Sequence, residues 1–559
     1  MSCKNKFKLT AVALMVGTAM NANAALYNVY ESLPEGSNFE NYGVAVQASS
    51  KNQESGEYDS CWGLQCSSEK YATGVEVKQL GAEGFDYRSE TPFNIGRGFD
   101  YLTDGRDGFE FYCDVFLDYN DTYCDESWTR REYDQGYRKE SVDKEINNSI
   151  ASVIPNNTGF PHRETNTVIT QISEDGSVTG NFNSGTVRNV GFSGNFSLET
   201  IETEKRTQAF GRVELDNAVY VAGSISTEIS SEPGYRSSQA AFWKFDKSNP
   251  TSVLQNGIYN WNGGSGYDGG RTSNASMRDI AVLGDKIYGV GYNADKDEYP
   301  RASVFVVPTD NSEDLTFYSL SWPGTDQDNY ENSILYTMNA NKLAVGTTKY
   351  YAGGSGFKRA YPNRLFYVKD VENDRTARFI SGGILFDGAN TKVGAINNFN
   401  ELVGTTDFDS RPEIDSTPRR QSAFITTLEA NSLDDGKRYK ELYDSQPRFL
   451  DDLTNGDNAD TDNNQYRIVE ASDINDAGVI SATALKCQGG YNSTAHNAKC
   501  GDGSSSLEKL VAIKLIPIQG ATADNIQPRG MESESVDRQG AGLGLWALTL
   551  LGLLGFRRK

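Results

Sequence analysis

Histidine is almost absent from this chain, since only His162 and His496 occur among its 559 residues. Neither lies in a His-x-x-x-His or Glu-x-x-His pattern, which argues against a histidine-based zinc site. No Gly-x-Ser-x-Gly elbow occurs, so a serine hydrolase triad would have to use a loop histidine. Residues 264–269 fit Gly-x-Gly-x-x-Gly, but the polar run after them is unlike the start of a Rossmann helix. We therefore identify no catalytic and no cofactor-binding residue, although the 76 acidic residues leave paired carboxylates open.

Basic residues are also scarce, because 53 Lys and Arg stand against 76 Asp and Glu, for a net charge of −23. A body this acidic repels phosphate backbones, so nucleic acid is not expected as a partner. The excess of acidic residues is typical of a solvated surface, or of a surface that binds calcium. Asp460, Asp462 and Asn464 place oxygen ligands at alternate positions, as calcium loops do. They are the metal candidate, with calcium the one cofactor considered; the alternative is a solvated acidic loop between repeats.

The N-terminus has the three parts of a signal peptide. Lys4, Lys6 and Lys8 precede an apolar or small-residue core at 9–20, and Ala22-Asn-Ala24 gives a small-x-small cleavage pattern. The core is shorter than the ~20 residues that a membrane-spanning helix needs. We expect signal peptidase to cut between Ala24 and Ala25, so that the chain is exported.

The cysteines agree with export. Apart from Cys3 in the predicted signal, six remain, in three sequence-local pairs: Cys61 with Cys66, Cys113 with Cys124, and Cys487 with Cys500. An even number in an exported chain favours disulfides, and proximity suggests these pairings among the 15 connectivities that six cysteines allow. The competing reading is zinc bound by the first four cysteines.

The C-terminus is a short apolar run that ends in cations. It begins at Gly540 and Gly542, continues without charge to residue 556 and closes with Arg557, Arg558 and Lys559. Terminal cations hold that end in the cytoplasm and leave the body outside. The pattern resembles the Gly-Gly C-terminal sorting signal of Gram-negative exported proteins. That resemblance implies cleavage by rhombosortase, a rhomboid-type protease, and a membrane-tethered precursor that becomes periplasmic, surface-bound or secreted. The alternative is a C-terminal core helix.

The body between these ends carries a repeat. An apolar lead-in, a polar turn and an apolar strand that usually ends in glycine recur six times, at residues 172–180, 215–223, 283–291, 338–346, 396–404 and 474–482. Asn, Asp and Gly tolerate the positive φ angles of tight turns, and the flanking alternation is that of paired strands. Each copy is therefore predicted to be a β-hairpin.

A second element follows most copies, with an aromatic or aliphatic anchor in a short strand. It lies at residues 208–210, 239–243, 302–306, 364–367, 421–425 and 510–513. One anchor per unit suits radially arranged sheets. We predict an all-β fold, a propeller of six or seven blades; a β-solenoid or two sandwiches are the alternatives.

The hairpin sequence Ile474-Asn-Asp-Ala-Gly478 and the strands at 239–242 and 421–424, which contain Ala-Phe, resemble extracellular repeats named for their His-Ala-Phe triplet. With both termini, the chain resembles a family of exported gammaproteobacterial proteins described as a domain of unknown function. The resemblance implies a repetitive β scaffold and carries no activity.

These observations divide the chain into a signal peptide (1–24), an N-terminal blade or insertion with two disulfides (25–166), the repeat body (167–516), a polar linker (517–539) and the sorting tail with a short membrane helix (540–559). Insertions on one face of a repeat protein are often its binding surface. The expected function is a non-catalytic binding scaffold of the cell envelope or surface, with a glycan or protein ligand. The alternative is a propeller-type enzyme acting on extracellular polysaccharide.

Overall fold

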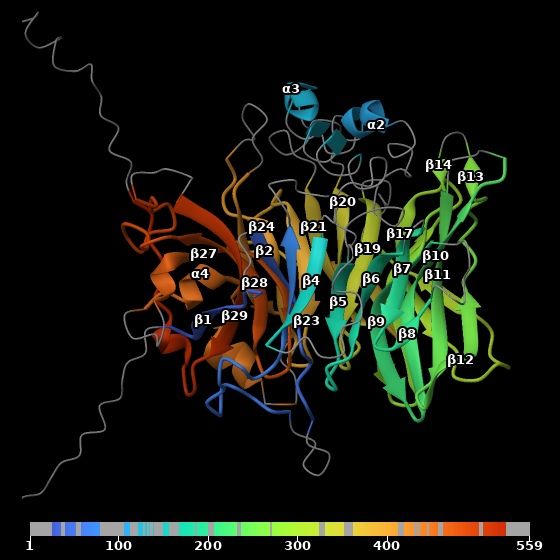
Figure 1. Cartoon of the computed structure of the whole chain (residues 1–559), viewed down its shortest axis with the longest axis horizontal. Coiled ribbons are helices and arrows are strands. Elements are labelled where there is room, and N and C mark those ends of the chain that lie inside the picture. The colour runs from blue at the N-terminus through green and yellow to red at the C-terminus, as the bar shows by residue number, and fades with distance from the viewer. Residues whose placement is uncertain are drawn as a thin grey trace, which may run out of the picture.

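The computed structural model in Figure 1 describes most of the β-rich body. The described residues are 25–34, 40–51, 58–78, 149–155, 167–184, 187–198, 206–231, 236–268, 271–323, 330–350, 362–411, 419–429, 446–456, 462–501 and 507–532, with short stretches between 105 and 138 and between 433 and 443. The predicted signal peptide and sorting tail lie outside them. Among the described residues, no helix is long and apolar enough to cross a membrane.

Seven antiparallel sheets form the blades of a β-propeller, six with four strands and one with three. From the innermost strand outward, blade 1 is β2 (Glu40–Val46), β3 (Thr73–Lys78) and β4 (Ser149–Ile154), and blade 2 is β5 (Thr167–Ile172), β6 (Val178–Ser184), β7 (Val187–Ser193) and β8 (Phe196–Ser197). Blade 3 is β9 (Arg206–Leu215), β10 (Ala218–Glu228), β11 (Arg236–Asp246) and β12 (Asn249–Ile258). Blade 4 is β15 (Ser276–Leu283), β16 (Lys286–Ala294), β17 (Pro300–Val307) and β18 (Thr316–Ser319).

The remaining blades continue this order. Blade 5 is β19 (Tyr330–Met338), β20 (Ala344–Tyr350), β21 (Asn363–Asp370) and β22 (Asp374–Phe379); blade 6 is β23 (Thr391–Ile396), β24 (Glu401–Asp407), β25 (Gln421–Thr427) and β26 (Arg448–Phe449); blade 7 is β27 (Tyr466–Ile474), β28 (Ile480–Cys487), β29 (Glu508–Pro517) and β1 (Tyr27–Glu31). A small ribbon, β13 (Tyr267–Asp268) and β14 (Arg271–Thr272), precedes blade 4. The short helices are α2 (Gly105–Phe111), α3 (Asp121–Tyr123), α4 (Leu450–Leu453), a π-helical turn (Arg438–Leu442) and two 3-10 turns (Asn463–Gln465 and Ala523–Asn525).

The ring is closed by the N-terminal strand. β1 pairs antiparallel with β29 over Tyr27 to Glu31 and becomes the outer strand of blade 7, as Figure 1 shows. Tyr27 is fully buried in a core shared with β27, β28 and β29. Blade 7 thus joins β1 to the last strands of the propeller, so separating them requires breaking the hydrogen bonds of a sheet.

The structure confirms the propeller and fixes seven blades. Each of the six predicted hairpins joins the first and second strands of a blade, from blade 2 to blade 7. Five of the six anchor strands are third strands. The exception is the segment 208–210, which lies in β9, the first strand of blade 3, and not in blade 2. A short Ala-Phe alternation suits any strand buried on both faces, so the motif alone does not identify which strand carries it.

Residues 25–166, predicted as an N-terminal blade or insertion, contain four strands. They supply β1 to blade 7 and the three strands of blade 1, with a long connection, 79–148, between β3 and β4. Part of the segment 517–539, predicted as a polar linker, packs against the body. Arg529 is buried, its backbone N–H donates to Asp452 Oδ1 at 2.7 Å, and His496 donates its backbone N–H to the Gly530 carbonyl. This segment is held by polar contacts, which an apolar pattern does not reveal.

Asparagines in the repeat turns join neighbouring blades at one end of the ring. Asn339, Asn397 and Asn475 each accept a backbone N–H of their own turn through Oδ1. Their Nδ2 groups donate to the next blade along, at the carbonyls of Asn397 (2.8 Å), Asn475 (3.0 Å) and Gln47 (2.9 Å). The repeat asparagine is therefore structural, because it shapes its own turn and binds the adjacent one.

The first strands also contact each other through the residue that follows a β-bulge. Gln171 Oε1, Asp279 Oδ2 and Asp473 Oδ2 accept the backbone N–H groups of Arg212, Met338 and Val46 in the next blade, at 2.7, 2.8 and 2.9 Å. These N–H groups lie on inner strand edges, where no further strand can pair with them.

Asp279 makes this contact sensitive to pH. Burial raises its pKa to about 6, and the N–H groups of Met338 and Ile280 oppose that rise only in part. Between about pH 4 and 6 the folded protein keeps a proton that the unfolded chain releases, so stability falls as pH rises through this window, by about 3 kcal/mol. We expect Asp279→Asn to remove this slope in urea unfolding measured at pH 4, 5, 6 and 7. An unchanged slope would show that Asp279 titrates normally in the fold.

Candidate functional site

The long connections of the propeller open at the end opposite the repeat turns. Each first strand runs toward its turn and the second returns, so the links between second and third strands meet at the other end, which we call the upper end. The longest are 79–148 in blade 1, 351–362 in blade 5, 408–420 in blade 6 and 488–507 in blade 7. Figure 1 shows α2, α3 and the β13–β14 ribbon at this end.

A cleft of about 710 Å³ opens between blades 6 and 7 near this end; we call it the 6–7 cleft. Its size suits a small ligand or part of a polymer. Blade 6 contributes the starts of β23 and β25 and the end of β24, and blade 7 contributes the start of β27 and the 488–507 loop. The charged lining residues are Lys392, Arg419, Arg420, Arg467, Glu470 and Glu508, and the uncharged polar ones include Asn390, Thr405, Gln421, Ser422 and Asn497.

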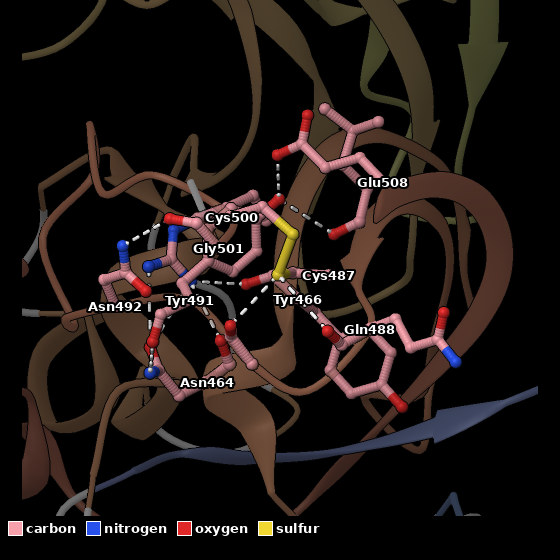
Figure 2. Close-up of a disulfide and its surroundings, with 12 residues drawn as sticks. Asn464, Tyr466, Cys487, Gln488, Tyr491, Asn492, Cys500, Gly501 and Glu508 are labelled. Atoms are coloured by element: carbon pink, nitrogen blue, oxygen red, sulfur yellow. Dashed lines mark hydrogen bonds between the residues drawn. A yellow bond between two sulfur atoms is a disulfide. The ribbon is translucent and has the colours of Figure 1, made fainter. Parts of the chain in front are cut away.

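The Cys487–Cys500 disulfide shapes the loop on the blade 7 side, shown in Figure 2. Within the loop, Asn492 Nδ2 donates to the Gly501 carbonyl at 2.7 Å. From β27, the Arg467 guanidinium donates to the Ser493 and Ala495 carbonyls, both at 3.0 Å. The loop wall is therefore covalently closed and pinned to the first strand of its blade.

Tyr491 and Glu508 form a pair on this wall. The Tyr491 hydroxyl donates to Glu508 Oε1 at 2.9 Å, and the Arg467 guanidinium lies 4.1 Å from the Tyr491 ring centre. Burial, followed by the hydrogen bond to Glu508, raises the pKa of Tyr491 far above its ordinary value. The phenol therefore stays protonated at neutral pH, as a hydrogen-bond donor rather than a nucleophile.

The cations that line the cleft differ in their hydrogen bonds and ion pairs. Arg419 is buried and pairs with Asp407 at 3.0 Å, and it donates to the Gly388 and Arg411 carbonyls. Burial, then the charge of Arg529, lowers the pKa of Arg467 to about 10, which leaves it charged at neutral pH. Lys392 and Arg420 are exposed. Neither side chain has a hydrogen bond or ion pair within the described part of the chain, although Arg420 stacks over Phe408 at 4.7 Å.

The wall also contains buried polar atoms that have no hydrogen-bond partner among the described residues. They are Thr405 Oγ1, Arg467 Nε and His496 Nδ1. His496 is anchored through its other ring nitrogen, which lies 3.0 Å from Asp452 Oδ1, and its ring contacts Phe408 and Phe449. Leaving a buried polar group unpaired costs about 1–3 kcal/mol. His496 Nδ1 lies 3.9 Å from Asp451 Oδ2, which is also buried and without a hydrogen-bond partner among the described residues.

The predicted disulfides are placed at opposite ends of the ring. Cys61 pairs with Cys66 in the loop between β2 and β3, beside the repeat turns, and Cys487 pairs with Cys500 at the upper end. These are the pairings expected from proximity. Cys124 is disulfide-bonded, while its predicted partner Cys113 lies outside the described residues.

The calcium prediction falls on a partly described segment. Asp460 lies outside the described residues. Asp462 Oδ2 accepts from Gln465 at 3.0 Å, and Asn464 Oδ1 accepts from Arg529 at 3.2 Å. Asn464 thus faces a guanidinium, an unfavourable neighbour for a calcium ion. No group of three or more His, Cys, Asp and Glu side chains able to hold a metal occurs within the described ranges. His162, Ala24, Gly540, Gly542, Arg557, Arg558 and Lys559 also lie outside those ranges, whereas Ala25 is described and buried.

Sequence reasoning missed the 6–7 cleft. Lys392, Arg420 and Glu470 are far apart in sequence, and each looks like an ordinary surface charge. The nearest sequence signal was the pair Cys487 and Cys500, which marks a constrained insertion of the kind that lines binding surfaces.

Solved structures with similar chain paths are distant. An α-L-arabinofuranosidase from Podospora anserina is 9% identical, with 55% of this chain and 89% of that chain covered, at a TM-score of 0.24. A Trypanosoma rangeli sialidase is 6% identical, with coverages of 61% and 49%, at a TM-score of 0.29. The WD40 domain of SCAP from fission yeast is 9% identical, with coverages of 64% and 85%, at a TM-score of 0.27.

Among curated proteins, no match to this chain is found. A family model matches residues 236–559, which include part of blade 3, all of blades 4 to 6 and most of blade 7. The chain therefore belongs to the family described as protein of unknown function (DUF3466).

Proposed function

We propose that this protein is an exported β-propeller of the cell envelope that binds a ligand without transforming it, through the 6–7 cleft. The observation that carries the proposal is the pair of exposed cations, Lys392 and Arg420, which have no ion pair with any described residue and line a cleft of about 710 Å³ in a chain of net charge −23. Exposed cations at a concave site suit a ligand of opposite charge.

Export rests on the two ends of the sequence. The predicted cleavage after Ala24 would leave a chain that begins two residues before β1, so the strand that closes the ring is retained. Two disulfides, Cys61–Cys66 and Cys487–Cys500, suit an oxidising compartment. The sorting tail at 540–559 would hold the precursor in the membrane until a rhomboid-type protease cuts near Gly540 and Gly542.

Replacing Arg557, Arg558 and Lys559 together with serine tests the tail. We expect the precursor to lose its orientation signal, so that the processed form falls at least several-fold in cell fractions probed by immunoblotting. Serine at the exposed Lys286, Lys296 and Lys369 serves as a control with the same loss of charge in the body. Unchanged processing and location in the tail variant would contradict the sorting role.

Double substitution of Lys392 and Arg420 with glutamate tests the binding site. The full chain is screened on an array of neutral, carboxylated, sulfated and phosphorylated glycans, and we expect anionic binding to fall at least tenfold in the variant. Lys296→Glu with Arg378→Glu is the control, since both side chains lie far from the cleft and pair with local acids. An array profile that is the same for all three proteins would contradict the proposal.

The second candidate is an enzyme acting on polysaccharide. It is favoured by Glu470 and Glu508, two carboxylates that line the same cleft, because glycoside hydrolysis uses such a pair. Release of reducing ends from an array ligand by the wild-type chain, abolished by Glu470→Gln, would replace binding with catalysis as the function.

A further inference from the structure

The charged groups that line the 6–7 cleft have both signs. Besides Lys392 and Arg420, Glu470 on β27 lines the cleft and makes no hydrogen bond or ion pair within the described part of the chain. Glu508 is also present, and one of its oxygens accepts from Tyr491. A ligand that is anionic at every position would meet these carboxylates as well as the cations, and like charges in contact cost several kcal/mol.

The uncharged residues that line the cleft further restrict the chemical class of the ligand. Asn390 and Gln421 add partly exposed amides to the lining, whereas Thr405 and Ser422 are buried. Lys392 is directly across the ladder from Thr405, and Thr405 is directly across from Ala423, so the three side chains share one face of blade 6. Ser422 lies one position away and Gln421 two. The cations thus share the cleft with amides, which both donate and accept hydrogen bonds and can bind sugar hydroxyls.

The wall of the cleft also contains buried polar atoms without a hydrogen-bond partner among the described residues. Thr405, Arg467 and His496 are each more than nine-tenths buried, and each keeps one polar atom without a partner among the described residues. Arg467 Nε–H is a donor, the Thr405 hydroxyl both donates and accepts, and the His496 nitrogen does either according to its tautomer. These atoms lie beneath the surface of the cleft, and His496 Nδ1 is 3.9 Å from Asp451 Oδ2, so the exposed charged groups are the ones that a ligand contacts.

We infer that the ligand of the 6–7 cleft is an acidic saccharide whose charge is a sugar carboxylate, such as a chain of uronic acids. Lys392 and Arg420 bind the carboxylate, and Glu470 accepts from sugar hydroxyls. One carboxylate and two or more hydroxyls on each ring match the mixed lining, whereas a densely sulfated or phosphorylated polymer keeps few free hydroxyls that could donate to Glu470. This inference rests on the proposed binding function and specifies its ligand class.

The test compares two forms of one ligand by titration calorimetry with the full chain. Tetragalacturonate carries four carboxylates, and its methyl ester has the same rings and hydroxyls without the charge. We expect the acid to bind at least tenfold more tightly than the ester. Lys392→Gln with Arg420→Gln should remove this difference by weakening only the acid, whereas Glu470→Gln should weaken both forms. Lys296→Gln with Arg378→Gln is the control and should change neither.

The outcomes separate the inference from the proposed function. Equal affinities for acid and ester, or a Glu470→Gln variant that binds both forms as the wild type does, would overturn the uronate assignment. If dextran sulfate binds in a Lys392- and Arg420-dependent manner and neither galacturonate form does, the cleft is a polyanion site; the uronate assignment then falls and the proposed function stands. If no anionic ligand responds to the Lys392 and Arg420 substitutions, both fall.

Discussion

Replacement of Gly223 by alanine is expected to destabilise the propeller by at least about 3 kcal/mol. A Cβ on Gly223 would lie 1.8 Å from the Gln208 carbonyl oxygen and 2.8 Å from its carbonyl carbon. Both are backbone atoms of the adjacent first strand, so no side-chain rotation relieves the overlap. The two strands would have to separate, with loss of ladder hydrogen bonds in the sheet of blade 3.

The physical cause is a β-bulge in the first strand. Gly223 is opposite Ala209, next to a register shift where the extra residue pushes the carbonyl toward β10. The same arrangement recurs at the terminal glycines of four other repeats, where an added Cβ would meet a first-strand carbonyl oxygen at 1.9–2.3 Å: Gly180, Gly291, Gly346 and Gly404.

Urea unfolding followed by circular dichroism measures the effect. Gly63→Ala is the matched control, because a Cβ there meets nothing within 4 Å and the backbone φ is not positive; its midpoint should stay close to that of the wild type. A Gly223→Ala midpoint within the range of the control would show that the bulge adjusts easily and that the glycine is dispensable.

The second large effect is expected at Glu401, which is fully buried where blades 6 and 7 meet the π-helical turn. Its Oε2 pairs with Arg438 Nη1 at 2.8 Å, and its Oε1 accepts from the Tyr443 hydroxyl at 3.2 Å. Tyr443 in turn is 2.8 Å from the hydroxyl of Tyr27 in β1. Burial, then the charge of Glu401, raises the pKa of both tyrosines, which keeps them protonated as donors.

Glu401→Leu removes the carboxylate that pairs with Arg438 and leaves the guanidinium buried beside Phe399. This change is expected to lower the free energy of unfolding by about 3–5 kcal/mol. Because the network reaches Tyr27, the strand that closes the ring should loosen first, so amide exchange of β1 should rise more than that of β10. Differential scanning calorimetry and hydrogen exchange measure the two effects.

Two variants make this prediction specific. Glu401→Leu combined with Arg438→Met removes both charges and should recover a large part of the lost stability. Glu429→Gln breaks the exposed pair with Lys369, at 3.1 Å, and should cost less than about 1 kcal/mol. If Glu401→Leu is as mild as Glu429→Gln, the buried pair contributes no more than a surface one.

The sequence by itself determined the architecture and most of its units. The turn asparagines, the alternation around them and the terminal glycines predict six hairpins, and all six are present between first and second strands. These features are readable because each acts within a dozen residues. Disulfide pairing was also local, and the pairs Cys61–Cys66 and Cys487–Cys500 are as expected.

The tertiary structure decided what depends on contacts between distant segments. The fourth strand of blade 7 was not predicted, because β1 near one end of the chain pairs with β29 near the other. The placement of residues 208–210 in a first strand, and the packing of Arg529 against blade 7, also depend on neighbours far away in sequence. The 6–7 cleft is of the same kind: Lys392, Arg420 and Glu470 are solitary charges along the chain, and only the meeting of two blades makes them one site.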